Sequence, residues 1–180
     1  MASKGGHYAF KVSVIGEYAV GKTSLIKRYM TNSFDEGYNA TLGAAISTFN
    51  TTVDKNEVSL QVWDLAGQTP FRKVRKQYLF GSDFALAVFD LTRRETLDAL
   101  TEWVADVRSA EPEVVCFLVG NKSDLIEERQ VPQEEAGAAA KNLAMSGYME
   151  TSAKDGTNIT ELFHAIARTL VRGTQRQPRG

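Results

Sequence analysis

The chain contains, at residues 16–24, the stretch Gly16-Glu17-Tyr18-Ala19-Val20-Gly21-Lys22-Thr23-Ser24. It directly follows the apolar run of residues 8–15, which has the character of a strand, and it leads into a segment with helical character that extends to about Met30. A strand that ends in a glycine-rich turn and continues into a helix directs a row of backbone N–H groups at one point, where the helix N-terminus adds partial positive charge. The stretch therefore predicts a phosphate-binding loop in an α/β fold, and residues 16–24 are called the phosphate loop below.

Individual residues of the phosphate loop have the chemistry that a nucleotide phosphate requires. Gly16 and Gly21 allow the backbone to fold around a phosphate without a Cβ in the way. Lys22 can reach the β- and γ-phosphates, and the Thr23 hydroxyl can coordinate Mg²⁺. The alternative, an ordinary glycine-containing turn before a helix, is disfavoured by the strand and the helix on either side. We therefore expect all nine residues of the loop to contact the ligand.

Length and composition limit the classes of protein. The chain has 180 residues, which suits one domain with a single core, and its net charge of −1 does not suggest a partner such as nucleic acid. No apolar stretch approaches the roughly 18 residues of a membrane span, and the polar start is no signal peptide. Cys116 is the only cysteine, so an internal disulfide is excluded and a cytoplasmic location fits. Within its apolar run Cys116 is expected to be a small buried hydrophobic residue.

Strand-like runs alternate with helix-period segments along the chain. The strands are expected near residues 10–15, 45–53, 58–63, 83–91, 113–119 and 148–150, and the helices near 22–30, 70–80, 97–107, 132–145 and 159–170. The second and third strands read as a hairpin. This order predicts an α/β fold of three layers, with a six-stranded, mostly parallel sheet, one antiparallel strand and helices on both faces. Asn158 and Glu161 suggest a capping box on the last helix.

A second motif, Asp64-Leu65-Ala66-Gly67-Gln68, follows the third strand. An acid at such a strand end can hold Mg²⁺, directly or through water, beside the phosphates. Gly67 would offer its backbone N–H to the γ-phosphate, and Gln68 could orient a water for in-line attack. An Asp-x-x-Gly sequence is also common in ordinary turns, so this motif alone leaves both interpretations open.

A third motif, Asn121-Lys122-Ser123-Asp124, follows the strand at residues 113–119. The Asp124 carboxylate can accept from both N1–H and the exocyclic amino group of guanine, whereas adenine has no donor at either position. Adenine would leave this carboxylate without a partner, and the cost of an unpaired buried polar group makes the discrimination between guanine and adenine large, of order 10⁴ or more. Asn121 could contact N7 or tie loops together, and the Lys122 stem could cover one ring face.

A fourth motif, at residues 150–154, follows the final strand. The small side chain of Ala153 lets its backbone N–H approach the guanine O6, and Ser152 and Lys154 flank it. In open α/β sheets the ligand lies beyond the carboxyl ends of the strands. Because all four motifs follow a strand, we expect them to meet at one edge of the sheet.

With these motifs in this order, the chain resembles a Ras-superfamily small GTPase from about residue 10 to residue 170, and it is most similar to the Rab branch. The resemblance implies the P-loop NTPase fold called a G domain over residues 1–172, with a disordered polar and basic tail over residues 173–180. It implies GTP and GDP as ligands, Mg²⁺ held by Thr23, Thr41 and Asp64, and catalysis by Gln68 and Lys22. It also implies that Phe34 lies edge-on to the guanine and that Tyr38 covers the phosphates.

The mechanism that the resemblance implies is a molecular switch. GTP and Mg²⁺ order Thr41 and Gly67, and hydrolysis releases the two switch loops, residues 34–43 and 64–80. Effector, exchange-factor and activating proteins then read these loops, in membrane trafficking or in signalling. We expect a monomeric chain.

Several positions depart from the family pattern. Tyr18 stands where Ras has glycine, which predicts slow hydrolysis and weak stimulation by an arginine-finger activator, unless the ring turns outward and has no effect. Thr69, Ile46 and the pair Leu79-Phe80 differ from Rab sequences, so the usual Rab partners are not expected. No cysteine stands near the end of the chain for prenylation, and a peripheral membrane location is expected only if the native chain is longer.

Two other functions are compatible with parts of the sequence. An ATP-using P-loop enzyme, such as a small-molecule kinase, would lack a use for Asp124. A pseudo-GTPase, a module that binds nucleotide with negligible turnover, is disfavoured by the presence of Lys22, Thr23, Thr41 and Gln68, but Tyr18 keeps it open.

Overall fold

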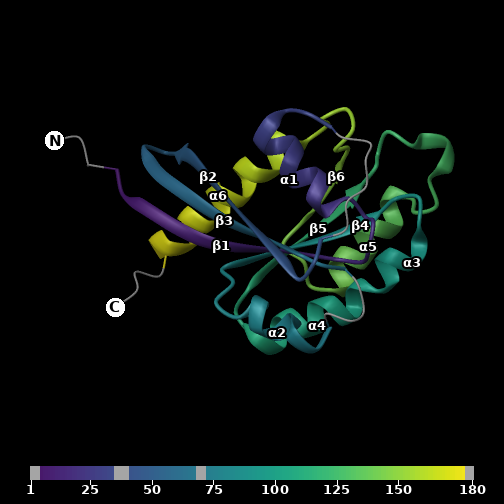
Figure 1. Cartoon of the computed structure of the whole chain (residues 1–180), viewed down its shortest axis with the longest axis horizontal. Coiled ribbons are helices and arrows are strands. Elements are labelled where there is room, and N and C mark those ends of the chain that lie inside the picture. The colour runs from purple at the N-terminus through teal and green to yellow at the C-terminus, as the bar shows by residue number, and fades with distance from the viewer. Residues whose placement is uncertain (1–4, 35–40, 68–71, 177–180) are drawn as a thin grey trace.

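The structure is a computed structural model of the chain, and it describes residues 5–34, 41–67 and 72–176. A six-stranded sheet in the order β2-β3-β1-β4-β5-β6 forms its centre (Figure 1). The hairpin strand β2 pairs antiparallel with β3, whereas β1 with β3, β1 with β4, β4 with β5 and β5 with β6 are parallel. The predicted mostly parallel sheet is therefore confirmed. The strands are β1 (His7–Ile15), β2 (Ala44–Val53), β3 (Asn56–Leu65), β4 (Phe84–Asp90), β5 (Val115–Asn121) and β6 (Tyr148–Thr151).

Helices cover both faces of the sheet. In Figure 1, α1 and α6 lie on one side of the strands and α2 and α4 on the other. Each side has its own hydrophobic cluster, one built with α1 and α6 and one with α2 to α5. This arrangement is the predicted three-layer fold. The helices are α1 (Lys22–Thr31), α2 (Arg72–Leu79), α3 (Arg94–Asp98), α4 (Leu100–Ala110), α5 (Gln133–Asn142) and α6 (Ile159–Arg176), with a 3₁₀ turn η2 (Ile126–Glu128).

Strand β4 shows why the two clusters stay separate. All seven of its residues are buried, as expected for a strand covered on both faces. Its side chains alternate, so that Leu86 and Val88 join the cluster under α1 and α6, while Ala87 and Phe89 join the other. A nearly continuous apolar run is thus shared between two layers.

The β2–β3 hairpin turns over two residues, Asp54 and Lys55, with φ angles of 48° and 69°. Positive φ at both central positions is the geometry that matches the twist of the flanking strands. The Asn56 amide donates to the Val53 carbonyl over 3.1 Å and reinforces the turn. The hairpin is confirmed, although β3 begins two residues earlier than the expected start at residue 58.

Three of the expected helices differ from the prediction. The single helix expected over residues 97–107 is divided at Ala99 into α3 and α4, and the helix expected to reach residue 145 ends at Asn142. Helix α6 continues through residue 176, so residues 173–176 are helical rather than part of a disordered tail, and residues 177–180 lie outside the described part. Asn158 does not have the extended backbone of a capping residue, because its φ is 58°, and its amide nitrogen donates to the Glu150 carbonyl over 2.8 Å.

Two smaller expectations concern single features. Cys116 is buried, with 3 % of its surface exposed, as predicted for a small core residue. Over the described ranges, no helix combines the length and the hydrophobicity that a membrane span requires.

Candidate functional site

The phosphate loop connects the carboxyl end of β1 to α1, and its shape depends on two glycines. Gly16 has a φ of 136° and Gly21 a φ of 96°, both in the region that side chains rarely adopt. A Cβ on Gly16 would collide with the Val88 carbonyl, and one on Gly21 would collide with the Asn121 amide. Both glycines are thus required by backbone geometry and by close packing against β4 and β5.

The Lys22 side chain is folded back into the phosphate loop. Its Nζ donates to the Gly16 carbonyl over 2.7 Å and to the Glu17 carbonyl over 2.8 Å, and only 7 % of the residue is exposed. Burial lowers the pKa of Lys22 to about 8, and the nearby charges of Asp64 and Glu17 only partly oppose this. An anion in the loop would therefore meet a buried ammonium group that lacks sufficient negative charge around it.

Thr23, Thr41 and Asp64 converge on one point, as the sequence predicts for a metal site. Asp64 Oδ2 accepts from the Thr23 hydroxyl over 2.5 Å and from the Thr41 hydroxyl over 3.2 Å, and the two hydroxyl oxygens are 2.8 Å apart. The other oxygen, Asp64 Oδ1, is buried and has no hydrogen-bond partner among the described residues. Burial raises the pKa of Asp64 despite these hydroxyl contacts and the charge of Lys22. Oxygen donors of this kind, with one carboxylate oxygen unsatisfied, fit a hard cation such as Mg²⁺.

Within the described ranges, no group of three or more His, Cys, Asp or Glu side chains could hold a metal ion. A cation at the Thr23–Thr41–Asp64 site would therefore need further oxygen ligands from water or from a phosphate. A position next to the phosphate loop is where such ligands would be available.

Gly67 lies against the phosphate loop. A Cβ at this position would collide with the backbone of Glu17 and with the backbone nitrogen of Tyr18. The glycine is therefore needed for packing between the second motif and the loop, a reason that the sequence alone did not reveal. Its position beside residues 17–18 brings the second motif to the same edge of the sheet as the first.

The third and fourth motifs are joined by hydrogen bonds. The Asp124 carboxylate accepts from the Ser152 hydroxyl over 2.7 Å. Ala153, the residue after Ser152, is buried, and Lys154 is exposed. Asn121 donates to the Val20 carbonyl over 2.9 Å and accepts from the Thr151 hydroxyl over 3.2 Å. Of the two roles left open for Asn121, the structure shows the tie between loops.

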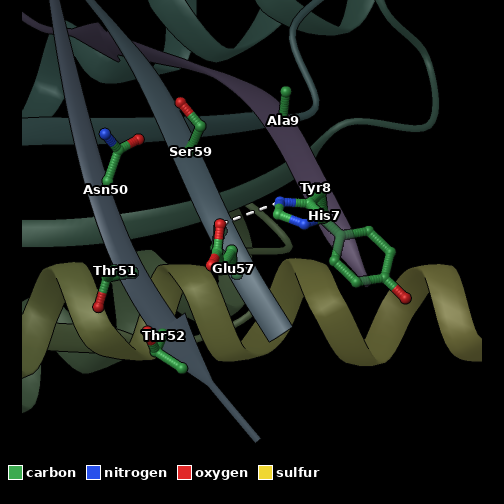
Figure 2. A pocket seen from close by; sticks show the side chains of 9 residues that line it. His7, Tyr8, Ala9, Asn50, Thr51, Thr52, Glu57 and Ser59 are labelled. Carbon is green, nitrogen blue, oxygen red and sulfur yellow. Dashed lines mark ion pairs between the residues drawn. The ribbon is translucent and has the colours of Figure 1, made fainter. Parts of the chain in front are cut away.

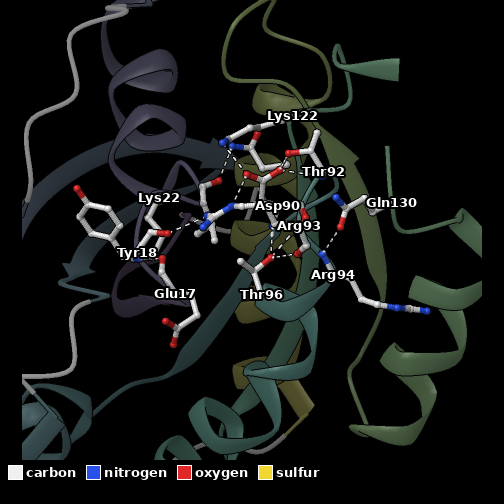
Figure 3. A network of polar contacts seen from close by, with 12 residues as sticks. Glu17, Tyr18, Lys22, Asp90, Thr92, Arg93, Arg94, Thr96, Lys122 and Gln130 are labelled. Atoms are coloured by element: carbon white, nitrogen blue, oxygen red, sulfur yellow. Dashed lines mark hydrogen bonds and ion pairs between the residues drawn. The ribbon is translucent and has the colours of Figure 1, made fainter. Parts of the chain in front are cut away.

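Asp90 and Arg93 are functional candidates that the sequence prediction missed. Asp90 ends β4 with none of its surface exposed, and its Oδ2 pairs with Lys122 Nζ over 2.6 Å and with Arg93 Nε over 3.1 Å (Figure 3). Arg93 also donates from Nη2 to the Tyr18 carbonyl over 2.9 Å. The available signal is an acid at the end of an apolar run, but the run of residues 83–91 as a whole has the pattern of a buried strand.

Helix α4 contacts the phosphate loop through a tryptophan side chain. Trp103 Nε1 donates to the Glu17 carboxylate over 2.9 Å. The Arg75 guanidinium of α2 lies 3.2 Å from the centre of the Trp103 ring and pairs with Asp106 over 2.9 Å. The sequence placed Trp103 on the core stripe of its helix, which is confirmed, but its N–H contact with the loop was not foreseen.

Two further predicted residues, Tyr18 and Phe34, are partly exposed. Tyr18 is 43 % exposed, and its ring extends away from Asp90 and Arg93 (Figure 3). Phe34 is 38 % exposed at the end of a described segment. Tyr38 and Gln68 lie outside the described residues, so their predicted positions stay predictions.

A groove of about 490 Å³ lies elsewhere, over β1, β2 and β3 near the amino end of β1 (Figure 2). Most of its lining side chains are small or uncharged, such as Ala9, Asn50 and Ser59. Two of its lining residues, His7 and Glu57, form an ion pair over 3.0 Å, and both are largely exposed. The groove is therefore distinct from the loops at the carboxyl ends of the strands.

Comparison with known proteins agrees with this geometry. A model described as the Ras family matches residues 11–172, a range that includes all four motifs. Proteins of this family bind guanine nucleotides with Mg²⁺, hydrolyse GTP and interact with effector, exchange-factor and activating proteins. Because the match covers nine tenths of the chain, the protein belongs to the Ras family.

Proposed function

We propose that this protein is a guanine-nucleotide switch that binds GDP and GTP at the phosphate loop and hydrolyses GTP to GDP. The observation that carries the proposal is the convergence of Thr23, Thr41 and Asp64 beside the buried Lys22, with one Asp64 oxygen that has no partner in the described part of the chain. The positive Lys22 ammonium and the negative Asp64 carboxylate thus lie near each other, and neither has its charge fully compensated by its neighbours. A phosphate with its bound cation would satisfy both.

At the phosphate end, Lys22 would exchange the Gly16 and Glu17 carbonyls for phosphate oxygens. The backbone N–H groups of residues 16–21 would donate to the same ligand. Thr23, Thr41 and Asp64 would hold Mg²⁺, which neutralises charge on the β- and γ-phosphates. We assign to Gln68 the orientation of the attacking water and to the Gly67 N–H a contact with the γ-phosphate.

At the base end, Asp124 would accept from the two guanine donors. The Ser152 hydroxyl already bonds to this carboxylate and would keep it oriented. The Lys122 stem would cover one face of the ring, Ala153 would approach O6, and Phe34 would lie edge-on to the base. Catalysis then depends on positioning and electrostatics rather than on a covalent intermediate.

The nucleotide state would be read through residues 34–43 and 64–80, with Tyr38 over the phosphates. We propose a Rab-like protein that acts in membrane trafficking or signalling through effector, exchange-factor and activating proteins. The support is the Trp63-Asp64 pair and the sequence after Gln68, which resemble Rab sequences. Tyr18 would slow hydrolysis, and a chain with no turnover would instead be a pseudo-GTPase.

The test is nucleotide binding and turnover by the purified chain. Native mass spectrometry should show GDP or GTP bound, and a time course with Mg²⁺-GTP should show slow release of phosphate. GDP should displace a fluorescent GDP at far lower concentration than ADP, by a factor of order 10⁴. Displacement by ADP and GDP at similar concentrations would contradict the proposal.

Asp124→Ala provides the matched variant for base recognition. Inosine diphosphate lacks the exocyclic amino group, so the wild-type protein should prefer GDP over inosine diphosphate. The variant should lose most of this preference because it has no carboxylate to accept from that group. An unchanged preference in Asp124→Ala would show that the base is read elsewhere.

A further inference from the structure

Asp90 connects two loops of the candidate site. Its carboxylate is fully buried, and it receives Arg93 and Lys122 on Oδ2 and both the backbone N–H and the hydroxyl of Thr92 on Oδ1. Burial by itself would raise the pKa of Asp90, but the contacts with Lys122 and Thr92 outweigh it and lower that pKa. The side chain is therefore an anion at neutral pH, with a cation on each side.

The two cations of Asp90 belong to different parts of the site. Lys122 lies in the third motif, next to the proposed base site, and has a φ of 67°. Arg93 follows β4 and reaches across to the phosphate loop, where it donates to the Tyr18 carbonyl over 2.9 Å. One buried carboxylate thus joins the loop that would read the base to the loop that would hold the phosphates (Figure 3).

The contact of Arg93 with the Tyr18 carbonyl has a direct consequence for the phosphate loop. A trans peptide unit is planar, so its C=O and the following N–H point in opposite directions. When Arg93 holds the Tyr18 carbonyl on its own side, the Ala19 N–H is directed to the other side of the loop. Ala19 has a φ of 59°, which side chains adopt rarely, so this local conformation needs an external contact to hold it.

The neighbouring residue is held in a similar way. Glu17 accepts from Trp103 through its side chain, and Gly67 packs on the backbone of residues 17–18. Arg93 also places a positive charge near the phosphate-binding Lys22, where the Glu17 carboxylate acts with the opposite sign. Its removal would free the peptide plane after Tyr18 and also reduce the positive potential in the loop.

We propose that Arg93 is a positioning residue that locks the phosphate loop in its anion-binding conformation and, through Asp90, ties that loop to Lys122. The inference rests on the proposed guanine-nucleotide binding and adds a determinant of how long the nucleotide stays bound. Arg93 touches no part of the base site directly, so the choice of base remains with Asp124.

The experiment measures release of N-methylanthraniloyl-GDP into excess GDP with Mg²⁺ present. Arg93→Ala should release the nucleotide about tenfold faster than the wild type, because a hydrogen bond from a charged donor is lost. Arg93→Lys keeps a charge beside Asp90, but a lysine lacks the planar guanidinium that bridges Asp90 and the Tyr18 carbonyl. Its release rate should therefore lie between those of the wild type and Arg93→Ala. Arg94→Ala is the matched control, because Arg94 is the next residue, pairs with Glu135 and extends away from the loop (Figure 3). Its release rate should equal that of the wild type.

A second readout separates positioning from general loosening of the fold. The preference for GDP over inosine diphosphate should be the same in Arg93→Ala as in the wild type, whereas loosening of the fold would reduce it. Release from Arg93→Ala at the wild-type rate, or faster release together with lost base preference, would overturn the inference. If Arg93→Ala does not fold, the rate of Arg93→Lys decides the question by the same criteria. Failure of the wild-type chain to bind GDP would instead reject the proposed function itself.

Discussion

At the residue scale, the site combines groups that are poorly satisfied on their own. Lys22 is buried, which lowers its pKa to about 8, and Asp64 has a buried oxygen with no partner within residues 5–34, 41–67 and 72–176. Both features cost stability in the protein without ligand, because desolvated charge is stabilised only by close counter-charges and hydrogen bonds. A phosphate and a cation would supply them, so the same residues that weaken the free protein favour binding.

Asp64→Asn should separate these two effects. The folded-state pKa of Asp64 is raised, so its ionised form destabilises the fold at neutral pH and the cost disappears as the pH falls towards the ordinary pKa of aspartate. The variant should therefore be more stable than the wild type without ligand at pH 7, with a smaller gain at pH 4. Urea unfolding at the two pH values measures this gain.

The same Asp64→Asn variant should lose the effect of Mg²⁺ on nucleotide affinity. An amide oxygen is a weaker ligand than a carboxylate for this hard cation. Titration of GDP with and without Mg²⁺ provides the comparison. A variant that is destabilised and still responds to Mg²⁺ like the wild type would contradict the assignment of Asp64 as a metal ligand.

Tyr18→Gly should hydrolyse GTP faster than the wild type in a single-turnover assay. The Tyr18 ring is 43 % exposed on a loop residue whose backbone packs against Gly67, and Gln68 follows directly in sequence. Removal of the phenol would leave more room for the glutamine and for an arginine supplied by an activating protein. An unchanged or slower variant would show that the ring turns outward and has no effect on turnover.

At the element scale, α2 is anchored at its C-terminal end. Lys11 of β1 donates to the Tyr78 and Phe80 carbonyls over 2.6 Å each, and Gly81 donates its N–H to Glu111 over 2.5 Å. Arg75 is held between Trp103 and Asp106 on α4. Because these contacts begin at Arg75, nucleotide-dependent movement of the second switch is expected in the residues that precede it.

Trp103→Phe should destabilise the protein by about 1 kcal/mol, because the aromatic ring under Arg75 is kept while the N–H to the Glu17 carboxylate is lost. Trp103→Ala should cost about 3–5 kcal/mol, because it also leaves a cavity in the core. Urea unfolding of both variants measures the difference. Equal stability of Trp103→Phe and the wild type would mean that the contact with Glu17 contributes nothing.

Trp63→Phe is the matched control for this pair. The Trp63 N–H is buried and has no hydrogen-bond partner among the residues that the structure describes, so its removal loses no such bond and relieves an unsatisfied group. The control variant should be as stable as the wild type or slightly more stable. A loss similar to that of Trp103→Phe would indicate a general cost of replacing tryptophan.

At the scale of the whole molecule, the site exists only where several loops meet. The carboxyl ends of β1, β3, β4, β5 and β6, together with the loops that follow them, contribute the phosphate loop, Asp64, Asp90, the third motif and the fourth motif. They are joined by side chains such as Asn121, which bonds to Val20 and Thr151, and Asp90, which bonds to Arg93 and Lys122. A nucleotide in this position would act as a further link between strands that are distant in sequence.

GDP with Mg²⁺ should therefore raise the unfolding temperature of the entire domain in one cooperative transition. At a free concentration one hundredfold above the dissociation constant, the gain should be about 2.7 kcal/mol. Calorimetry with GDP and with the same concentration of ADP tests this, and ADP should have little effect. Equal stabilisation by both nucleotides would argue against guanine recognition by the assembled loops.

Several elements of the fold and the site could be predicted because their causes are local. The phosphate loop lies within nine consecutive residues, and its glycines, lysine and threonine have defined roles at that spacing. Asp64 and Asp124 each follow an apolar strand, and the carboxyl ends of parallel strands share one edge of a sheet. The alternation of strands and helices then brings these motifs together without knowledge of any particular contact.

The sequence by itself thus determined the sheet, the order of its layers and the position of the four motifs. Only the tertiary structure decided the side-chain links between them, because these join residues far apart in the chain: Arg93 reaches back 75 positions to Tyr18, Trp103 86 positions to Glu17, and Asn121 101 positions to Val20. An arginine, a tryptophan or a buried aspartate can serve the core, the surface or a site equally well by its type and local pattern. Its role depends on the partners that folding places within about 3 Å, and no local periodicity encodes them.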